Sequence, residues 1–136
     1  MSDSSRRQFL AGAATLSAAA AVGTAQAGQI CSDLPPVVHK VYFWLKNPTS
    51  TEDRDQLIAG LKTLGAISTV QGIHVGVPAS TEQRDVVDNS YQVSELLLFA
   101  NAADQDAYQI DPIHLKFVEQ CSHLWSKVVV YDSIAV

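Results

Sequence analysis

The chain has 136 residues, 47% of them hydrophobic, and a net charge of −5 at pH 7. This length provides for one domain of ordinary size. Nucleic acids and anionic membranes both attract basic patches, so the acidic balance argues against either as a partner.

The first 27 residues have the pattern of an export signal. A twin arginine, Arg6-Arg7, precedes an apolar run over residues 11–22, and Ala25-Gln26-Ala27 is typical of a cleavage site. A membrane anchor is the weaker alternative, because the run is shorter than the ~20 residues that a span needs. Cleavage would leave 136 − 27 = 109 residues, with seven basic and thirteen acidic side chains. We therefore expect a periplasmic or secreted protein with no membrane partner once residues 1–27 are removed.

Residues 28–36 read as an N-terminal tail that ends in two prolines, and residues 37–136 read as one domain. Apolar residues alternate with others in three segments of this domain, which is the period of a strand, and a fourth segment has three valines and a tyrosine. The strands are predicted over residues 37–46, 72–77, 91–99 and 127–131. The polar, charged residues 78–90 are predicted to form a loop between the second and third strands.

Helix starts are marked by local signals. Thr49, with Glu52 three residues later, offers a capping box, and Gly65 is a typical helix end. Asn101 is predicted to cap a short helix that runs to about residue 108. The Asp-Pro pair at 111–112 combines an N-cap residue with proline at the first helical position, and this helix should run to about residue 125.

The predicted order is β-α-β-β-α-β, with the second helix broken at residues 111–112. This is the ferredoxin-like α+β arrangement, in which helices cover one face of a four-stranded antiparallel sheet. Two helices cover only one face of the sheet. Little of the remaining surface is suited to water, because the strands are rich in apolar residues, among them Val41, Phe43 and Leu45. We therefore expect a second copy of the chain to cover the sheet, giving a dimeric α/β barrel.

His114 is the first candidate for a functional residue. At 100° per residue it falls within the apolar arc of its helix, between Phe117 and Trp125, whereas Lys116 and Glu119 fall on the other side. The ordinary pKa of a histidine is ~6.5, and an apolar pocket favours its neutral form, which suits general base catalysis at neutral pH. The alternative is a buried histidine that bonds a backbone carbonyl and stabilises the helix start.

The residues that surround His114 resemble a known family. The strand Val38-His39-Lys40-Val41, Phe99 at the end of the third strand, and the Tyr-x3-Pro-x-His spacing from Tyr108 to His114 are similar to the Dabb family of stress-responsive dimeric α/β-barrel proteins. The resemblance spans residues 37–133. It implies a homodimer in which each subunit encloses a pocket between its sheet and its helices.

The resemblance also implies site residues. The plant olivetolic acid cyclase of this family closes a polyketide with a histidine and a tyrosine as acid–base partners, and these positions fall on His114 and Tyr108. The implied substrate-binding lining is His39, Val41, Phe43 and Val93. Two positions depart from the family. Asp111-Pro112 stands where the family commonly has His-Pro. Val93 stands where the cyclase has a histidine, which argues against the same cyclase activity.

Three functions follow as alternatives. The chain is an exported dimer that binds a small hydrophobic molecule, with lyase or cyclase chemistry at His114 and Tyr108. Otherwise it is a non-catalytic stress or structural protein of the same fold. The third alternative, related through barrel architecture alone, is a cofactor-independent monooxygenase or a haem-binding protein.

The sequence gives little indication of a metal site or of a disulfide bond. None of the four histidines has the spacing of a metal motif, and we expect neither a metal nor a cofactor. Cys31 and Cys121 could pair in an oxidising compartment. Cys121 lies on the apolar arc, which favours a buried thiol over a disulfide.

Overall fold

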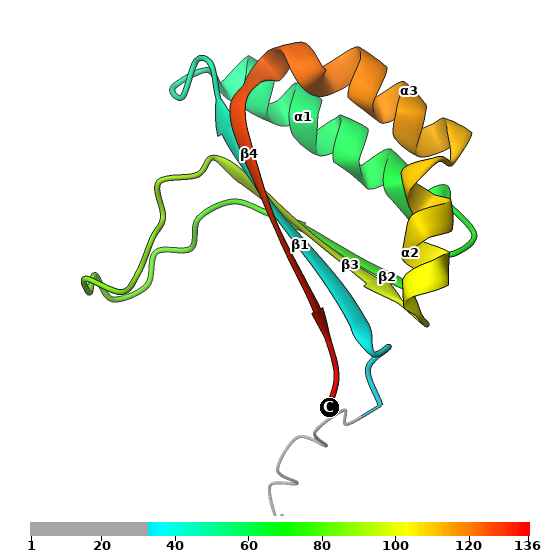
Figure 1. The fold of residues 1–136 in the computed structure, drawn as a ribbon. Coiled ribbons are helices and arrows are strands. Elements are labelled where there is room, and N and C mark those ends of the chain that lie inside the picture. The colour runs from blue at the N-terminus through cyan, green and yellow to red at the C-terminus, as the bar shows by residue number, and fades with distance from the viewer. Residues whose placement is uncertain (1–32) are drawn as a thin grey trace, which may run out of the picture. The chain divides into compact units, whose positions relative to one another are not determined.

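The computed structural model describes residues 33–136 (Figure 1). In chain order the elements are β1 (Val37–Leu45), α1 (Thr51–Thr63), the 3-10 turn η1 (Leu64–Ala66), β2 (Gly72–Gly76), β3 (Val93–Phe99), α2 (Ala102–Gln109), α3 (Pro112–Cys121), the 3-10 turn η2 (Ser122–Leu124) and β4 (Trp125–Ile134). The strands pair antiparallel in the order β2-β3-β1-β4. Figure 1 shows the helices on one side of the sheet. The ferredoxin-like α+β fold is confirmed.

The strand β1 lies at the centre of this sheet, between β3 and β4. Its residues alternate between buried and half-buried along its whole length, as the period-two pattern predicts. The buried set faces the helices: Val37, His39, Val41, Phe43 and Leu45. The sequence therefore places every second residue of β1 in the core and leaves the intervening residues for the other side of the sheet.

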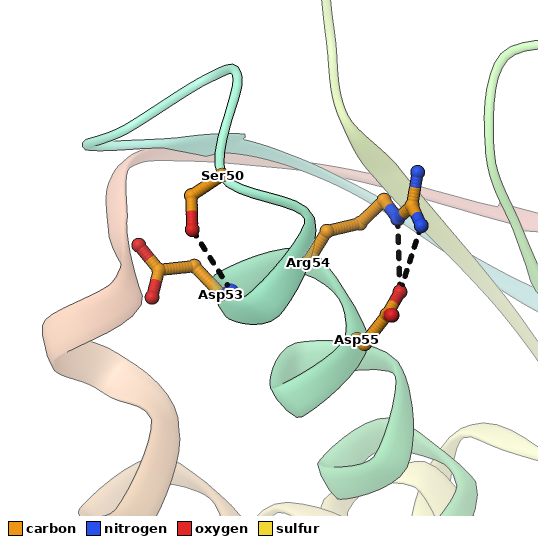
Figure 2. Close-up of polar contacts among 4 residues, drawn as sticks. All are labelled: Ser50, Asp53, Arg54 and Asp55. Carbon is orange, nitrogen blue, oxygen red and sulfur yellow. Dashed lines mark hydrogen bonds and ion pairs between the residues drawn. The ribbon is translucent and has the colours of Figure 1, made fainter.

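The first helix begins one residue later than its sequence signal suggests. The cap is Ser50 rather than Thr49, and the Ser50 hydroxyl accepts a hydrogen bond of 3.1 Å from the Asp53 N–H (Figure 2). Both residue pairs have the three-residue spacing of a capping motif, so spacing alone does not distinguish them. Figure 2 also shows the Arg54 guanidinium paired with the Asp55 carboxylate, at 2.9 Å from Nη2.

The two later helix starts agree with their signals. The Asn101 side chain accepts a hydrogen bond from the Asp104 N–H at the start of α2, at 2.8 Å. Asp111 caps α3 by accepting from the Ile113 N–H, also at 2.8 Å, and Pro112 is the first helical residue. The helix is shorter than predicted, because the 3-10 turn η2 replaces its last turn before β4.

The helices α1 and α3 pack closely because α1 has a glycine at their contact. A Cβ atom built on Gly60 would lie 2.6 Å from the Cys121 sulfur and 3.1 Å from the Phe117 ring. A side chain at position 60 would therefore force the Cys121 and Phe117 side chains to shift. Cys121 is buried at this contact, and burial raises the pKa of its thiol.

The last strand is longer than predicted and fixes a register that the sequence does not reveal. It covers Trp125–Ile134, whereas the three valines and a tyrosine predict only residues 127–131. Its pairing with β1 places Asp132 opposite His39 and Val130 opposite Val41. The added residues bring an acidic side chain beside a buried histidine.

The side of the sheet away from the helices carries the uncovered apolar surface. Val41, Phe43 and Leu45 are buried under the helices, the side on which the family resemblance expects Val41 and Phe43, so these residues are not part of the surface left for a second copy. The other side holds alternate residues of β1, β3 and β4: Val38, Lys40, Tyr42, Trp44, Leu96, Leu98, Val129 and Tyr131. The predicted loop between β2 and β3 leaves the sheet as an extended arm in Figure 1. The apolar surface that a second copy could cover is therefore this opposite side.

Some expectations lie outside the described residues. The export signal, its cleavage site and Cys31 all fall within residues 1–32. Among residues 33–136, no helix is both long enough and apolar enough to cross a membrane.

Candidate functional site

A pocket of about 160 Å³ lies between the helix-covered face of the sheet and the helices α2 and α3. Its apolar lining is Val41, Phe43, Phe117, Val118, Trp125, Val128 and Val130, and its polar lining is His39, Glu95, Tyr108, Gln109 and His114. Val118, Val128 and Val130 are each more than a third exposed, so the pocket opens between α3 and β4. An apolar pocket with a few polar groups is the usual form of a small-molecule site.

Tyr108 and His114 face each other across the break between α2 and α3. Their ring centroids are 4.5 Å apart, and Tyr108 is 1% exposed. The chain changes direction between the end of α2 at Gln109 and the Asp111 cap of α3. This break brings the last turn of α2 against the first turn of α3. The sequence-predicted acid–base candidates are therefore adjacent within one pocket.

The protonation of His114 follows from its hydrogen bond. Its Nδ1 lies 3.0 Å from the Gln109 carbonyl oxygen, which can only accept, so Nδ1 carries the proton. Burial lowers the pKa of His114 and keeps the imidazole neutral, with Nε2 as the unprotonated nitrogen. The alternative interpretation of His114 expects a hydrogen bond to a backbone carbonyl, and the bond to Gln109 is such a bond. The same bond sets the tautomer that a general base needs.

Tyr108 is held in its protonated form. Burial raises the pKa of its hydroxyl above the ordinary range, and the negative charge that Glu95 carries once it is ionised at high pH adds to the shift. A phenol that does not ionise serves as a hydrogen-bond donor to an oxygen that gains negative charge. The hydroxyl of Tyr108 therefore suits an acid role rather than a base role.

His39 is buried and held by an aspartate. Its Nδ1 lies 2.6 Å from Asp132 Oδ1, and the carboxylate accepts from that nitrogen. The Gln105 amide lies 3.2 Å from the same nitrogen. The ring also packs edge-on against Tyr108, with centroids 5.8 Å apart. A carboxylate behind a histidine fixes its tautomer and orientation, as in many catalytic sites.

Glu95 is a pocket residue that is absent from the candidates predicted from the sequence. It is 3% exposed, and within the described residues its Oε1 has no hydrogen-bond partner. Burial raises the pKa of Glu95 to about 8, so the side chain is a neutral carboxylic acid at pH 7. A signal is present in the sequence, because strand alternation places Glu95 on the same face as Val93 and Leu97.

The remaining predicted residues divide between the pocket and the core. Val41 and Phe43 line the pocket beside His39. Val93 is fully buried on the same face of β3 and lies outside the pocket lining. Across the described part of the chain, no three His, Cys, Asp or Glu side chains cluster as a metal site would require.

A second hollow, of about 450 Å³, lies on the opposite side of the sheet. Its lining is Lys40, Tyr42, Trp44, Val86, Asp88, Tyr91 and Tyr131. The end of the loop between β2 and β3 contacts β1 there. The Trp44 indole N–H donates a hydrogen bond of 3.0 Å to Ser90, and the centroids of the Tyr42 and Tyr91 rings are 5.0 Å apart. This hollow belongs to the uncovered face and has none of the candidate acid–base residues.

The fold is similar to several solved structures. A protein from Arabidopsis thaliana aligns with a TM-score of 0.63 at 24% identity, over 74% of this chain and 96% of its own. The hydroxynitrile lyase from Passiflora edulis aligns with a TM-score of 0.62 at 24% identity, over 75% and 95%. A dimeric ferredoxin-like protein of unknown function from Thermobifida fusca aligns with a TM-score of 0.60 at 16% identity, over 72% and 89%. These likenesses establish the fold alone.

Comparison with curated proteins gives no match. The family comparison is decisive, because residues 37–135 match the Stress responsive A/B Barrel Domain. The match covers β1 to β4 and includes every pocket residue. The chain is a member of the Dabb family.

Proposed function

We propose that this chain is an exported homodimeric Dabb protein that binds a small hydrophobic molecule between its sheet and helices. The proposed chemistry is of the lyase or cyclase type, with His114 as general base and Tyr108 as general acid. The observation that carries the proposal is the contact of these two rings within an apolar pocket, at 4.5 Å between centroids.

The chemistry follows from the state of each group. His114 Nε2 accepts a proton from a carbon next to a carbonyl, and the electron pair of that C–H bond moves toward the carbonyl oxygen. The Tyr108 hydroxyl donates a hydrogen bond to this oxygen as its negative charge grows. The resulting enolate attacks a second carbonyl carbon in a cyclase, and the reverse bond cleavage occurs in a lyase. The apolar lining makes the surroundings of both groups less polar, which strengthens both contacts.

Dimerisation is proposed through the uncovered face of the sheet. Tyr42, Trp44 and Leu98 leave an aromatic and apolar surface on that side, which the helices do not reach. Structural neighbours from three sources are described as dimeric proteins of this fold. The lyase name of the Passiflora neighbour is in keeping with the proposed reaction type, and it supplies no site residue to this chain.

The first experiment measures carbon acid chemistry directly. Acetophenone is a small aromatic ketone, and NMR in D₂O follows deuterium entering its methyl group. We expect the wild-type protein to catalyse this exchange and His114→Ala to lose it by about 10²–10⁴-fold. His123→Ala is the matched control, since His123 lies exposed in η2 and should exchange at the wild-type rate.

The same measurement identifies the outcomes that contradict the proposal. Equal exchange by His114→Ala and wild-type protein would remove His114 from catalysis. No exchange by the wild-type protein, together with a filled pocket and assemblies larger than a dimer in native mass spectrometry, would favour the structural function. Export is tested separately, by recovering the processed chain from the periplasm of a strain with and without its twin-arginine translocase.

A further inference from the structure

We propose that Glu95 recognises the ligand, donating a hydrogen bond from its carboxylic acid group to the carbonyl oxygen of a small, neutral aldehyde or ketone. The inference rests on the proposed function and specifies its substrate class. It adds to the tyrosine–histidine pair a second donor, located on the sheet rather than on the helices.

The geometry of Glu95 supports this role. The side chain is on β3, with Val41 of β1 and Val75 of β2 as its register partners. It reaches the pocket that contains Tyr108 and His114, and it is 3% exposed. Its Oε1 has no partner among the described residues, although buried polar groups in folded proteins are nearly always hydrogen-bonded. A ligand atom in the pocket would supply the partner that Oε1 lacks.

The protonation state selects the class of ligand. With a pKa raised to about 8 by burial, Glu95 carries its proton at pH 7 and donates rather than accepts. A carbonyl oxygen is the simplest acceptor that remains neutral in an apolar pocket. A protonated carboxyl beside a tyrosine is a known means of stabilising an enolate oxygen in enzymes. No Lys or Arg is among the described residues that line this pocket, which argues against a phosphate as the ligand.

The pocket also limits ligand size. Its 160 Å³ is below the ~300–1,000 Å³ of typical drug-sized pockets, so the ligand is small. Phe43, Phe117 and Trp125 supply aromatic walls suited to a flat apolar body. A single ring that carries one carbonyl group satisfies these limits.

The proposed step is balanced without any co-reactant. His114 Nε2 removes the proton from the carbon next to the carbonyl, the C–H electron pair forms the C=C bond, and the C=O π electrons move onto oxygen. The Glu95 O–H remains bonded to its own oxygen and donates a hydrogen bond to the enolate. Return of a proton, or of a deuteron from solvent, to the carbon restores the ketone.

The test compares two ligands of nearly equal shape. Acetophenone has a carbonyl oxygen where α-methylstyrene has a CH₂ group, and ligand-observed NMR measures the affinity of each. We expect the wild-type protein at pH 7 to prefer acetophenone by about tenfold, which is the worth of one good hydrogen bond. Glu95→Leu should lose this preference and bind α-methylstyrene at least as well as the wild type.

Glu95→Gln is the conservative variant, because its amide N–H donates at any pH. It should keep the preference for acetophenone at pH 7 and at pH 9, whereas the wild type should lose it as pH rises past about 8. The other titratable groups that line the pocket are His39, Tyr108 and His114, and Asp132 contacts His39. All four are unchanged between the two proteins. If Glu95→Leu fails to fold, this pH comparison decides the question.

The possible results separate the two proposals. Loss of exchange in His114→Ala, with an unchanged acetophenone preference in Glu95→Leu and a pH-independent preference in the wild type, would overturn the role of Glu95 alone. Binding of neither ligand by the wild type would overturn both. Loss of the preference in Glu95→Leu and its retention in Glu95→Gln would establish Glu95 as the carbonyl donor.

Discussion

The two faces of the central strand β1 have different surroundings, although their residues alternate along one segment of the chain. Phe43 is 3% exposed and lines the pocket under the helices, whereas its neighbour Tyr42 contacts aromatic rings on the uncovered side. The helix-covered face encloses buried ionisable groups, and the other face carries Lys40 and a cluster of aromatic rings. One strand thus lines the pocket with one face and carries the uncovered apolar surface on the other.

The alternation of β1 separates two environments, the pocket under the helices and the uncovered face. A shift of one residue in the register of β1 would exchange its two faces and place Lys40 in the core and His39 on the aromatic surface. Because the pocket face is buried against helices, this register is strongly specified. Substitutions at adjacent positions should therefore act on different properties, which separate measurements can distinguish.

The largest expected effect is on the covered face. Phe43→Ala should lower the free energy of unfolding by about 3–5 kcal/mol, the usual cost of truncating a buried phenylalanine. The measurement is urea denaturation followed by circular dichroism. A charged residue at this position should unfold the domain or fill the pocket. An unchanged midpoint in Phe43→Ala would remove Phe43 from the core.

On the uncovered face, Tyr42→Glu should leave each subunit folded and weaken the proposed dimer by about 10–100-fold, because it buries an unpaired charge in the interface twice. Sedimentation or native mass spectrometry over a concentration series measures this. Leu115→Glu is the matched control, since Leu115 is 54% exposed on α3. Equal dimer masses for both variants would place the interface elsewhere.

Glu95, on the covered face, should make the stability of the fold depend on pH. Burial raises the pKa of Glu95 from 4.5 to about 8, so between these values the folded state keeps a proton that the unfolded state releases. The contribution of Glu95 to the free energy of unfolding is fully present below pH 4.5. It falls by about 1.4 kcal/mol per pH unit as the pH rises, until about pH 8. Denaturation at several pH values should show this slope in the wild type and not in Glu95→Gln.

The ionisation of His114 changes stability with pH in the opposite direction, but it does not affect the comparison of the wild type with Glu95→Gln. Its pKa is lowered by burial, so its contribution to stability is lost as pH falls through the acid range. The effect is common to the wild type and to Glu95→Gln, and the difference between the two proteins isolates Glu95. Parallel pH profiles for these proteins would mean that Glu95 ionises normally.

Much of the fold was predictable because its signals are local. Asn101 and Asp111 cap their helices as predicted, since a cap depends only on neighbouring backbone N–H groups. The period-two pattern likewise located β1 and β3. The exact cap of α1 was not determined, because Thr49 and Ser50 each begin a motif of the same spacing.

The pairing of Tyr108 with His114 was also accessible, because both lie beside the same helix break. Their spacing in the sequence and the family resemblance both indicate this pair. Their roles in binding or catalysis stay predictions until the exchange experiment is done. For these residues, short separation along the chain limits how far apart the side chains can be.

The sequence alone determined the starts of α2 and α3, the alternation of β1 and β3 and one pair of candidate residues, all of which depend on contacts within a few positions. Only the tertiary structure placed Asp132 at 2.6 Å from His39, because strand register across 93 residues is set by packing rather than by local pattern. Glu95 required the same information. Its alternation marked it as inward-facing, but the lack of a partner for its carboxyl group depends on the helices, strands and pocket that surround it.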